Sequence, residues 1–292
     1  MRAQITLTPT ESKKLIAKAI ANLDSVKRAS EVGLLVIHPS SSTFFIVEEL
    51  TGKRPKTSVW VSGVIVPKGA CLSGAASRLN ISRAQTGGPK PDEYTHSWVI
   101  QGGELTLGIS LRELFEKMGT EDIYIKGVNT LDPKGTVGIL IGSHVERGTI
   151  GRVISASRRK GFKLIFPVGL EKLIPVNIED AAKEAIKTKY YYSMGVNCGL
   201  LPCKEGMVVT ETKAVEILCG AKAIPIAAGG LDGAEGAITM VIKGEKEQVT
   251  RAISYAEECK GARLPRVNSP NCDDCNSVIC DFPVRNKPWI RR

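Results

Sequence analysis

The predicted fold rests on one apolar stretch, Val32-Gly33-Leu34-Leu35-Val36-Ile37, and on the polar loop that follows it, His38-Pro39-Ser40-Ser41-Ser42-Thr43. A short apolar run without alternation is typical of a strand buried on both faces, as in a parallel sheet. The loop leads into an amphipathic stretch over residues 44–50, which predicts a helix. The order strand, polar loop, helix therefore indicates the first unit of an α/β sheet.

The same pattern recurs on both sides of this unit. Upstream, Thr8-Pro9-Thr10-Glu11 is typical of a capped helix start, with a proline in the first turn. Downstream, strands are predicted over 59–66, 123–125, 137–141 and 163–168, and helices over 111–118 and 149–160. We expect residues 1–190 to form a Rossmann-like domain, a parallel sheet with helices on both faces, which binds ligands outside the carboxyl ends of its strands.

The pattern changes after about residue 190. Residues 207–259 read as β-α-β-β-α, and a final strand near 264–267 would complete a ferredoxin-like unit. We therefore predict a smaller ferredoxin-like α+β domain over residues 191–268 and a Cys-rich C-terminal tail over residues 269–292.

Composition narrows the choice of partners. The 292 residues carry 40 Lys and Arg against 30 Asp and Glu, a net charge of +10, which favours anionic ligands. Aromatic residues make up 5% of the chain and do not alternate with basic ones, so nucleic acid is not the expected partner.

The sequence shows neither a secretory start nor an apolar run long enough to span a membrane. Eight cysteines then indicate free thiols in a reducing compartment. We expect a cytoplasmic homo-oligomer without membrane contact.

The polar loop before residue 44 is the first candidate binding site. Ser41, Ser42 and Thr43 lie where a buried strand ends and a helix begins, so hydroxyls, backbone N–H groups and the helix dipole can hold a phosphate or carboxylate. An ordinary Ser/Thr helix cap explains the same residues. The loop lacks the glycines and lysine of a P-loop, which argues against a nucleoside triphosphate.

A second candidate site is the predicted strand-to-helix loop over residues 143–149. Its polar side chains are Ser143, His144, Glu146, Arg147 and Thr149. His144 and Glu146 are of the types that act as general acid and base, and Arg147 with Arg152 offers donor forks for an anion. A solvated polar turn is the alternative interpretation.

The cysteines of the tail suggest a metal. Cys272, Cys275 and Cys280 form a C-x2-C-x4-C run, a spacing that lets neighbouring thiolates face one ion. Zinc or an iron–sulfur cluster needs a fourth ligand, for which we predict Cys259, with Cys198 and Cys203 as alternatives. Surface thiols or a redox pair of Cys272 and Cys275 remain open.

Two stretches resemble ribose-5-phosphate isomerase and its relatives. The first runs from Gly33-Leu34-Leu35-Val36-Ile37 through the Ser/Thr loop to Glu48-Glu49-Leu50, and the second is Asp122-Ile123-Tyr124-Ile125-Lys126-Gly127-Val128-Asn129-Thr130-Leu131-Asp132. That superfamily also contains glucosamine-6-phosphate deaminase, sugar-responsive repressor domains and the coenzyme A transferases. The resemblance covers roughly the first 170 residues and implies a phosphate loop after the first strand, with a ferredoxin-like unit beside the main domain.

The chain departs from the isomerase pattern Asp-x-x-Ile-Asp-Gly-Ala-Asp-Glu-x-Asp. Its outer acids correspond to Asp122 and Asp132, but Lys126 and Asn129 replace the two inner acids that the isomerase keeps in its active site. Aldose–ketose isomerisation needs a carboxylate base, so this substitution argues against that reaction and for a more anionic ligand.

From these loops together we predict a site for a phosphorylated or carboxylated metabolite. Lys126, Asn129, His144 and Glu146 are expected nearest the chemistry, and the ligand is expected to contact Ser41, Ser42, Thr43, Asp132, Arg147 and Thr149. An isomerase-like or acyl-CoA-related enzyme is the leading hypothesis. A non-catalytic metabolite sensor or a metal-binding accessory protein is the alternative.

Overall fold

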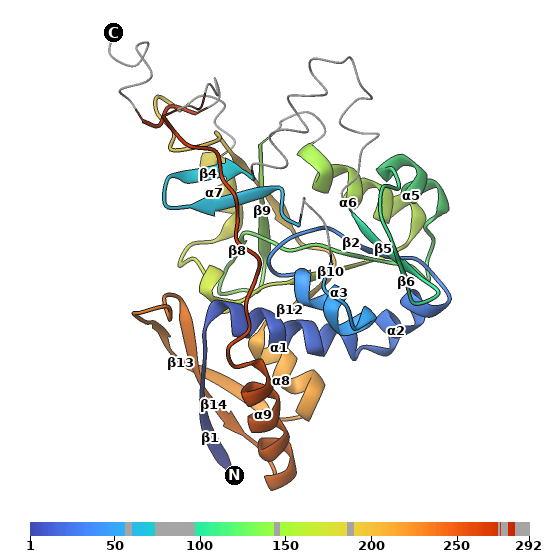
Figure 1. The fold of residues 1–292 in the computed structure, drawn as a ribbon, viewed down its shortest axis with the longest axis vertical. Coiled ribbons are helices and arrows are strands. Elements are labelled where there is room, and N and C mark those ends of the chain that lie inside the picture. The colour runs from blue at the N-terminus through green and yellow to red at the C-terminus, as the bar shows by residue number, and fades with distance from the viewer. Residues whose placement is uncertain are drawn as a thin grey trace.

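The computed structural model describes residues 1–55, 60–73, 97–142, 147–185, 190–273, 275 and 280–283. Within these residues the chain forms a mixed α/β fold with eight α-helices around a central sheet (Figure 1). In this part of the chain no helix combines the length and apolar character needed to cross a membrane. The predicted α/β class is thereby confirmed.

The central sheet has six strands, of which four are parallel. In sheet order they are β12 (Met207–Val209), β10 (Lys163–Pro167), β7 (Ile123–Ile125), β2 (Leu35–Ile37), β5 (Trp98–Gln101) and β6 (Glu104–Thr106). The strands from β12 to β2 run parallel, and β5 and β6 add two antiparallel strands. The sheet is therefore mixed, whereas the sequence predicted a parallel one.

Side chains on alternate positions of the parallel strands feed two different cores. Ile37 and Ile125 lie in the core that contains residues of α1 (Pro9–Ala21) and α3 (Phe44–Thr51). Val36 and Tyr124 lie in the core that contains residues of α5 (Leu111–Lys117) and α6 (Gly148–Lys160). Helices thus pack on both faces of the sheet, as its apolar strands predicted.

A second, antiparallel sheet has the order β1 (Arg2–Leu7), β14 (Ala237–Lys243) and β13 (Lys222–Gly229). Two helices, α8 (Glu211–Cys219) and α9 (Lys246–Cys259), share a core with it. This unit differs from the ferredoxin-like order expected from the sequence. The strand at 207–209 joins the central sheet as β12, and residues 264–267 form no strand. Instead β1, from the start of the chain, takes the edge beside β14.

The remaining strands form two smaller sheets. One has the order β11 (Gly199–Cys203), β9 (Val137–Ile141) and β8 (Thr130–Leu131), all antiparallel, so the prediction that 137–141 belongs to the parallel sheet is wrong. The other is the hairpin of β3 (Gly63–Val66) and β4 (Gly69–Leu72). After α9 the chain runs without a helix or strand toward this hairpin (Figure 1).

The largest core spans the boundary predicted near residue 190. It contains Leu15 and Phe45, Ile123 of β7, and also Leu218 and Val249 of the C-terminal half. Three further short elements complete the described part: α2 (Asp24–Glu31), the 3₁₀ turn η3 (Leu170–Lys172) and α7 (Ile178–Ala185). The two stretches predicted as domains therefore bury apolar surface against each other.

Candidate functional site

His38 and Lys126 extend two neighbouring parallel strands at their carboxyl ends. The register pairs Ile37 with Ile125, and the ladder continues because the N–H of His38 donates to the carbonyl of Ile125 and that of Lys126 to Ile165. Side chains alternate along a strand, so both residues lie on the face that carries Val36 and Tyr124. This edge is where ligands of α/β sheets usually bind.

Lys126 is buried at this edge, with 8% of its surface exposed. Burial lowers the pKa of its ammonium from 10.5 to about 7, and the thiol of Cys203 on β11 acts weakly against that shift. Burial also raises the pKa of Cys203 to about 12, so the thiol stays protonated near neutral pH. Lys126 is therefore a lysine whose charge is close to balance between its two forms at pH 7.

A polar cluster adjoins Lys126 on the same face. The hydroxyl of Tyr124 lies 3.5 Å from Nδ1 of His38. Burial raises the pKa of Tyr124 to about 12, while a hydrogen bond with Ser97 and the charge of Arg152 on α6 act in the opposite direction. His38, Tyr124, Ser97 and Arg152 thus bring an imidazole, two hydroxyls and a guanidinium to the strand end.

The loop over residues 38–43 packs directly against the loop after β7. A Cβ on Gly127 would meet the Ser40 Oγ at 2.5 Å, so glycine permits this approach. Within the loop, the N–H groups of Thr43 and Phe44 donate to the carbonyl of Ser40, and the Thr43 hydroxyl donates to the carbonyl of His38. Thr43 is fully buried, and Ser41 is half-buried. Thr43 therefore stabilises the conformation of the loop.

Ser42 contacts a second lysine whose pKa is lowered. The ammonium of Lys172, in η3, donates to the Ser42 Oγ at 3.2 Å and to the carbonyl of Val128 at 2.8 Å. Burial lowers the pKa of Lys172 to about 8, the charge of Lys13 lowers it further, and Glu171 and Glu211 oppose the shift. Lys172 has two protein acceptors, whereas the described residues offer none to the Lys126 ammonium, and Lys172 ties the loops 38–43 and 126–129 together.

Asp132 and Asn129 hold the backbone beside the site. The carboxylate of Asp132 accepts the N–H groups of Lys134, Thr136 and Ile178, the last at the start of α7. Burial raises the pKa of Asp132, and these backbone bonds outweigh it and lower the pKa overall. The Asn129 side chain accepts the N–H of Leu140 on β9. The two residues predicted near the ligand therefore serve the turns around β8 and β9.

Two residues of the second predicted loop lie at the start of α6. Arg147 is exposed and precedes the helix with φ of 56°, in the left-handed region, and Thr149 is half-buried in the first turn. His144 and Glu146, predicted as acid and base, lie outside the described residues.

The structure separates Cys259 from the tail cysteines. Cys259 is fully buried in the core on α9, where burial raises its thiol pKa to about 12 and Lys18, Lys14, Glu49 and Glu258 are the groups that act on it. None of the eight cysteines forms a disulfide. Among the described residues, no three His, Cys, Asp or Glu side chains stand close enough to hold a metal ion as they are placed.

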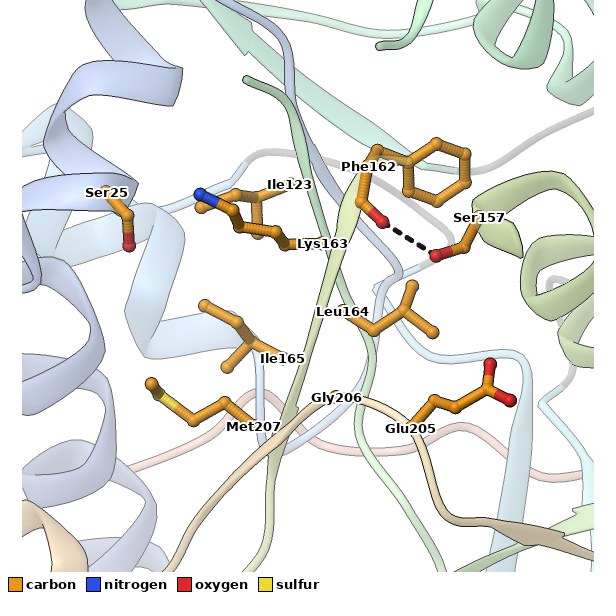
Figure 2. A pocket seen from close by; sticks show the side chains of 10 residues that line it. All are labelled: Ser25, Ile123, Ser157, Phe162, Lys163, Leu164, Ile165, Glu205, Gly206 and Met207. Atoms are coloured by element: carbon orange, nitrogen blue, oxygen red, sulfur yellow. Dashed lines mark hydrogen bonds between the residues drawn. The ribbon is translucent and has the colours of Figure 1, made fainter. Parts of the chain in front are cut away.

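A cavity of about 310 Å³ lies at the opposite edge of the sheet (Figure 2). It opens between the amino ends of β7, β10 and β12, and its polar lining includes Lys163 and Glu205. Glu205 is paired with Arg158 of α6 at 2.8 Å. This cavity does not include any residue predicted for the ligand, so it is distinct from the Lys126 edge.

Sequence reasoning missed Tyr124 and Lys172, and it included His38 in the candidate loop without giving it a role of its own. The register of β2 and β7 places His38 beside Lys126, and that register depends on which strands pair. The spacing of Tyr124 and Lys126 could have indicated this cluster. Residues two positions apart in a strand have their side chains on the same face.

No protein-family model matches the chain, and neither a curated protein nor a solved structure matches it.

Proposed function

We propose that the protein binds a phosphorylated or carboxylated metabolite at the carboxyl ends of β2 and β7, where Lys126 receives the anionic group. One observation carries the proposal. Lys126 is buried, its pKa falls to about 7, and among the described residues no carboxylate is close enough to restore that pKa. Burying an amine without a counter-charge is costly, and such groups concentrate at functional sites.

An anion beside Lys126 would supply the missing counter-charge. It favours the ammonium form, so binding raises the pKa of Lys126 and takes up a proton from solution. Above pH 7 the free energy of taking up that proton from solution becomes less favourable as the pH rises. The affinity for the anion is therefore expected to fall about tenfold for each pH unit above the pKa of the free site.

The neutral amine gives the site a chemical capability as well. A lysine that loses its proton near pH 7 can act as a general base or attack a carbonyl carbon. His38 follows the neighbouring strand on the same face, and its Nδ1 lies 3.5 Å from the Tyr124 hydroxyl, so the face also carries groups that can exchange protons. We therefore favour an enzyme, isomerase-like or transferase-like, and the resemblance to the ribose-5-phosphate isomerase superfamily puts sugar phosphates and acyl-coenzyme A compounds first among the ligands to test.

The test begins with thermal-shift screening of sugar phosphates, phospho-acids and acyl-coenzyme A compounds. The best ligand is then titrated by calorimetry between pH 6 and pH 9, in buffers of different ionisation enthalpy. We expect proton uptake near one per site at pH 8 for the wild type, and loss of binding in Lys126→Ala.

Lys163→Ala is the matched control, because Lys163 also lies on a parallel strand but is exposed at the opposite edge. Binding that survives in Lys126→Ala and disappears in Lys163→Ala would place the ligand in the cavity of Figure 2 and refute the proposal.

A second measurement separates an enzyme from a sensor. If the ligand carries a carbonyl group and Lys126 attacks it, the amine and carbonyl condense to an imine with loss of water, which borohydride reduces to a stable secondary amine. Mass spectrometry then finds the ligand on Lys126. Tight binding without turnover or trapping would favour the sensor.

We also propose a cytoplasmic location, because cysteines without disulfides are typical of a reducing compartment.

A further inference from the structure

The C-terminal tail is attached at two points that bracket its cysteines. Before them, the ammonium of Lys68, in the turn of the β3–β4 hairpin, donates to the carbonyl of Pro270 at 2.5 Å. After them, Asp281 and Ser193 bind each other twice: the N–H of Asp281 donates to the Ser193 carbonyl at 3.1 Å, and the N–H of Ser193 donates to the Asp281 carboxylate at 2.9 Å. The tail thus contacts the hairpin just before its cysteines, at Pro270, and the loop near residue 193 just after them, at Asp281.

The hairpin and that loop are themselves in close backbone contact. The N–H of Ala70 donates to the carbonyl of Met194 at 3.3 Å, and the N–H of Val196 donates to the carbonyl of Ala70 at 2.6 Å. A Cβ on Gly195 would come within 1.9 Å of the Ala70 carbonyl oxygen, so only glycine allows this approach. Ala70 is therefore fixed between the tail's two attachment points.

Cys71 is the residue next to Ala70 on β4, in the hairpin that the tail contacts at Pro270. Burial raises the pKa of the Cys71 thiol, Cys280, Cys272 and Cys275 raise it further and Lys68 lowers it, so the three tail cysteines lie within electrostatic range of Cys71. All four are partly buried and none is in a disulfide. The N–H of Cys275 bonds to the carbonyl of Cys272 at 3.4 Å, which closes the tight turn of the C-x2-C pair.

We propose that Cys71, Cys272, Cys275 and Cys280 together bind one zinc ion. Four thiolates in a tetrahedron are the ligand set of structural zinc sites, and a C-x2-C turn supplies two of them at the right spacing. Binding releases four thiol protons and replaces them with four zinc–sulfur bonds, while no electron is transferred. As they are placed in the described residues, the four thiols are too far apart to hold an ion, so zinc binding would draw them together.

The site has a structural purpose in this fold. The described residues of the tail form no helix or strand, so few of their backbone groups are fixed by regular hydrogen bonds. A zinc ion would join it to a hairpin some 200 residues earlier in the chain, as the Lys68–Pro270 separation of 202 positions indicates. The site shares no residue with the proposed anion site, so each can fail without the other.

The experiment measures metal in the full chain purified under anaerobic, reducing conditions. We expect one zinc per chain by mass spectrometry of the elements. Titration against a competing chelator should show that Cys71→Ser and Cys275→Ser lose more affinity than the roughly 10–100-fold that loss of an outer-shell partner costs. Cys198→Ser is the matched control, since Cys198 is also partly buried and free, and it should keep full affinity. Cys259→Ala should keep it too.

Cobalt substitution keeps the test valid where a serine variant fails to fold. The wild type should show the absorption bands of tetrahedral cobalt with four thiolates, and Cys71→His should bind cobalt with bands shifted toward three thiolates and one nitrogen. Gly195→Ala, which changes no ligand, should weaken zinc binding because it forces Ala70 away. Unchanged affinity in Cys71→Ser, loss of zinc in Cys259→Ala, no metal in the reduced wild type, or a brown protein with iron and sulfide would each overturn the proposal.

Discussion

Replacing Lys126 by methionine removes an amine that burial keeps largely uncharged above neutral pH. The folded-state pKa, about 7, lies below the ordinary value of 10.5, so the unfolded chain binds a proton that the folded chain lacks. The energetic cost of Lys126 is complete at pH 7 and below, and it disappears as the pH rises to 10.5. Stability of the wild type should therefore increase across this window.

We expect Lys126→Met to be more stable than the wild type by roughly 1–4 kcal/mol at pH 7, and by much less at pH 10. Urea unfolding at the two pH values measures the difference. Lys163→Met, at an exposed position, should change stability little at either pH. A gain of equal size at both pH values would contradict the assignment of the lowered pKa to Lys126.

Asp132 affects the pH dependence of stability through the opposite charge type: it is an acid that is stabilised in its charged form. Its pKa is lowered in the folded state, so its contribution to stability is present above the ordinary value of 3.8 and is lost as the pH falls through the folded-state pKa. Asp132→Ala leaves three backbone N–H groups without their acceptor and should cost about 2–4 kcal/mol at pH 7.

Thermal unfolding as a function of pH measures the Asp132 effect. The gap between wild type and Asp132→Ala should narrow toward pH 3. Asp180→Ala, which removes only an exposed pair with Lys183, should stay within about 0.5 kcal/mol of the wild type. A gap that does not change with pH would show that the carboxylate charge is not what holds these N–H groups.

At the scale of elements, the entry into β12 depends on one glycine. Gly206 has φ of +106°, and a Cβ there would lie 2.9 Å from both the Cβ and the carbonyl oxygen of Leu164 on β10. Gly206→Ala should therefore push β12 from the sheet edge and cost about 2–4 kcal/mol. Gly135 has φ of +84° with open space around it, so Gly135→Ala should cost only about 1 kcal/mol.

Chemical denaturation of the two glycine variants gives the comparison. Equal losses would mean that backbone conformation alone, and not the approach of β12 to β10, sets the cost at Gly206.

Local patterns predicted helices and strands better than they predicted which strands pair with one another. The helix beginning after Thr8 follows its capping box and α6 follows its apolar spacing, because both signals depend on residues three or four positions apart. Residues 207–209 and 137–141 were predicted as strands, and they are strands, yet both pair differently from the expectation. Strand pairing depends on contacts between distant segments, which a short pattern does not contain.

The candidate site follows the same rule. Lys126 was predicted because a cation replaced an acid at a strand end, which is local information. Its burial and its neighbour His38 depend on the pairing of β2 with β7. Cys71 escaped prediction as a ligand because it lies about 200 residues from the tail, on a hairpin whose position only the folded chain defines.

At the scale of the whole molecule, one core joins the N-terminal and C-terminal halves. The buried cluster runs from α1 and α3 through β2 and β7 to α8, β14 and α9. Its continuity predicts that the described part of the chain unfolds in a single cooperative transition. Differential scanning calorimetry should give equal calorimetric and van't Hoff enthalpies; two resolved transitions would mean that the halves are separate domains after all.

The position of β1 also bears on how the chain is made. Thr6 and Thr239 face each other across β1 and β14, 233 positions apart. A ribosome releases β1 long before β14 exists, so the first strand leaves the exit tunnel without its partner and with an unpaired edge. The small sheet can close only after β14 has been made, so the edge of β1 stays unpaired while the 233 positions that separate Thr6 from Thr239 are synthesised.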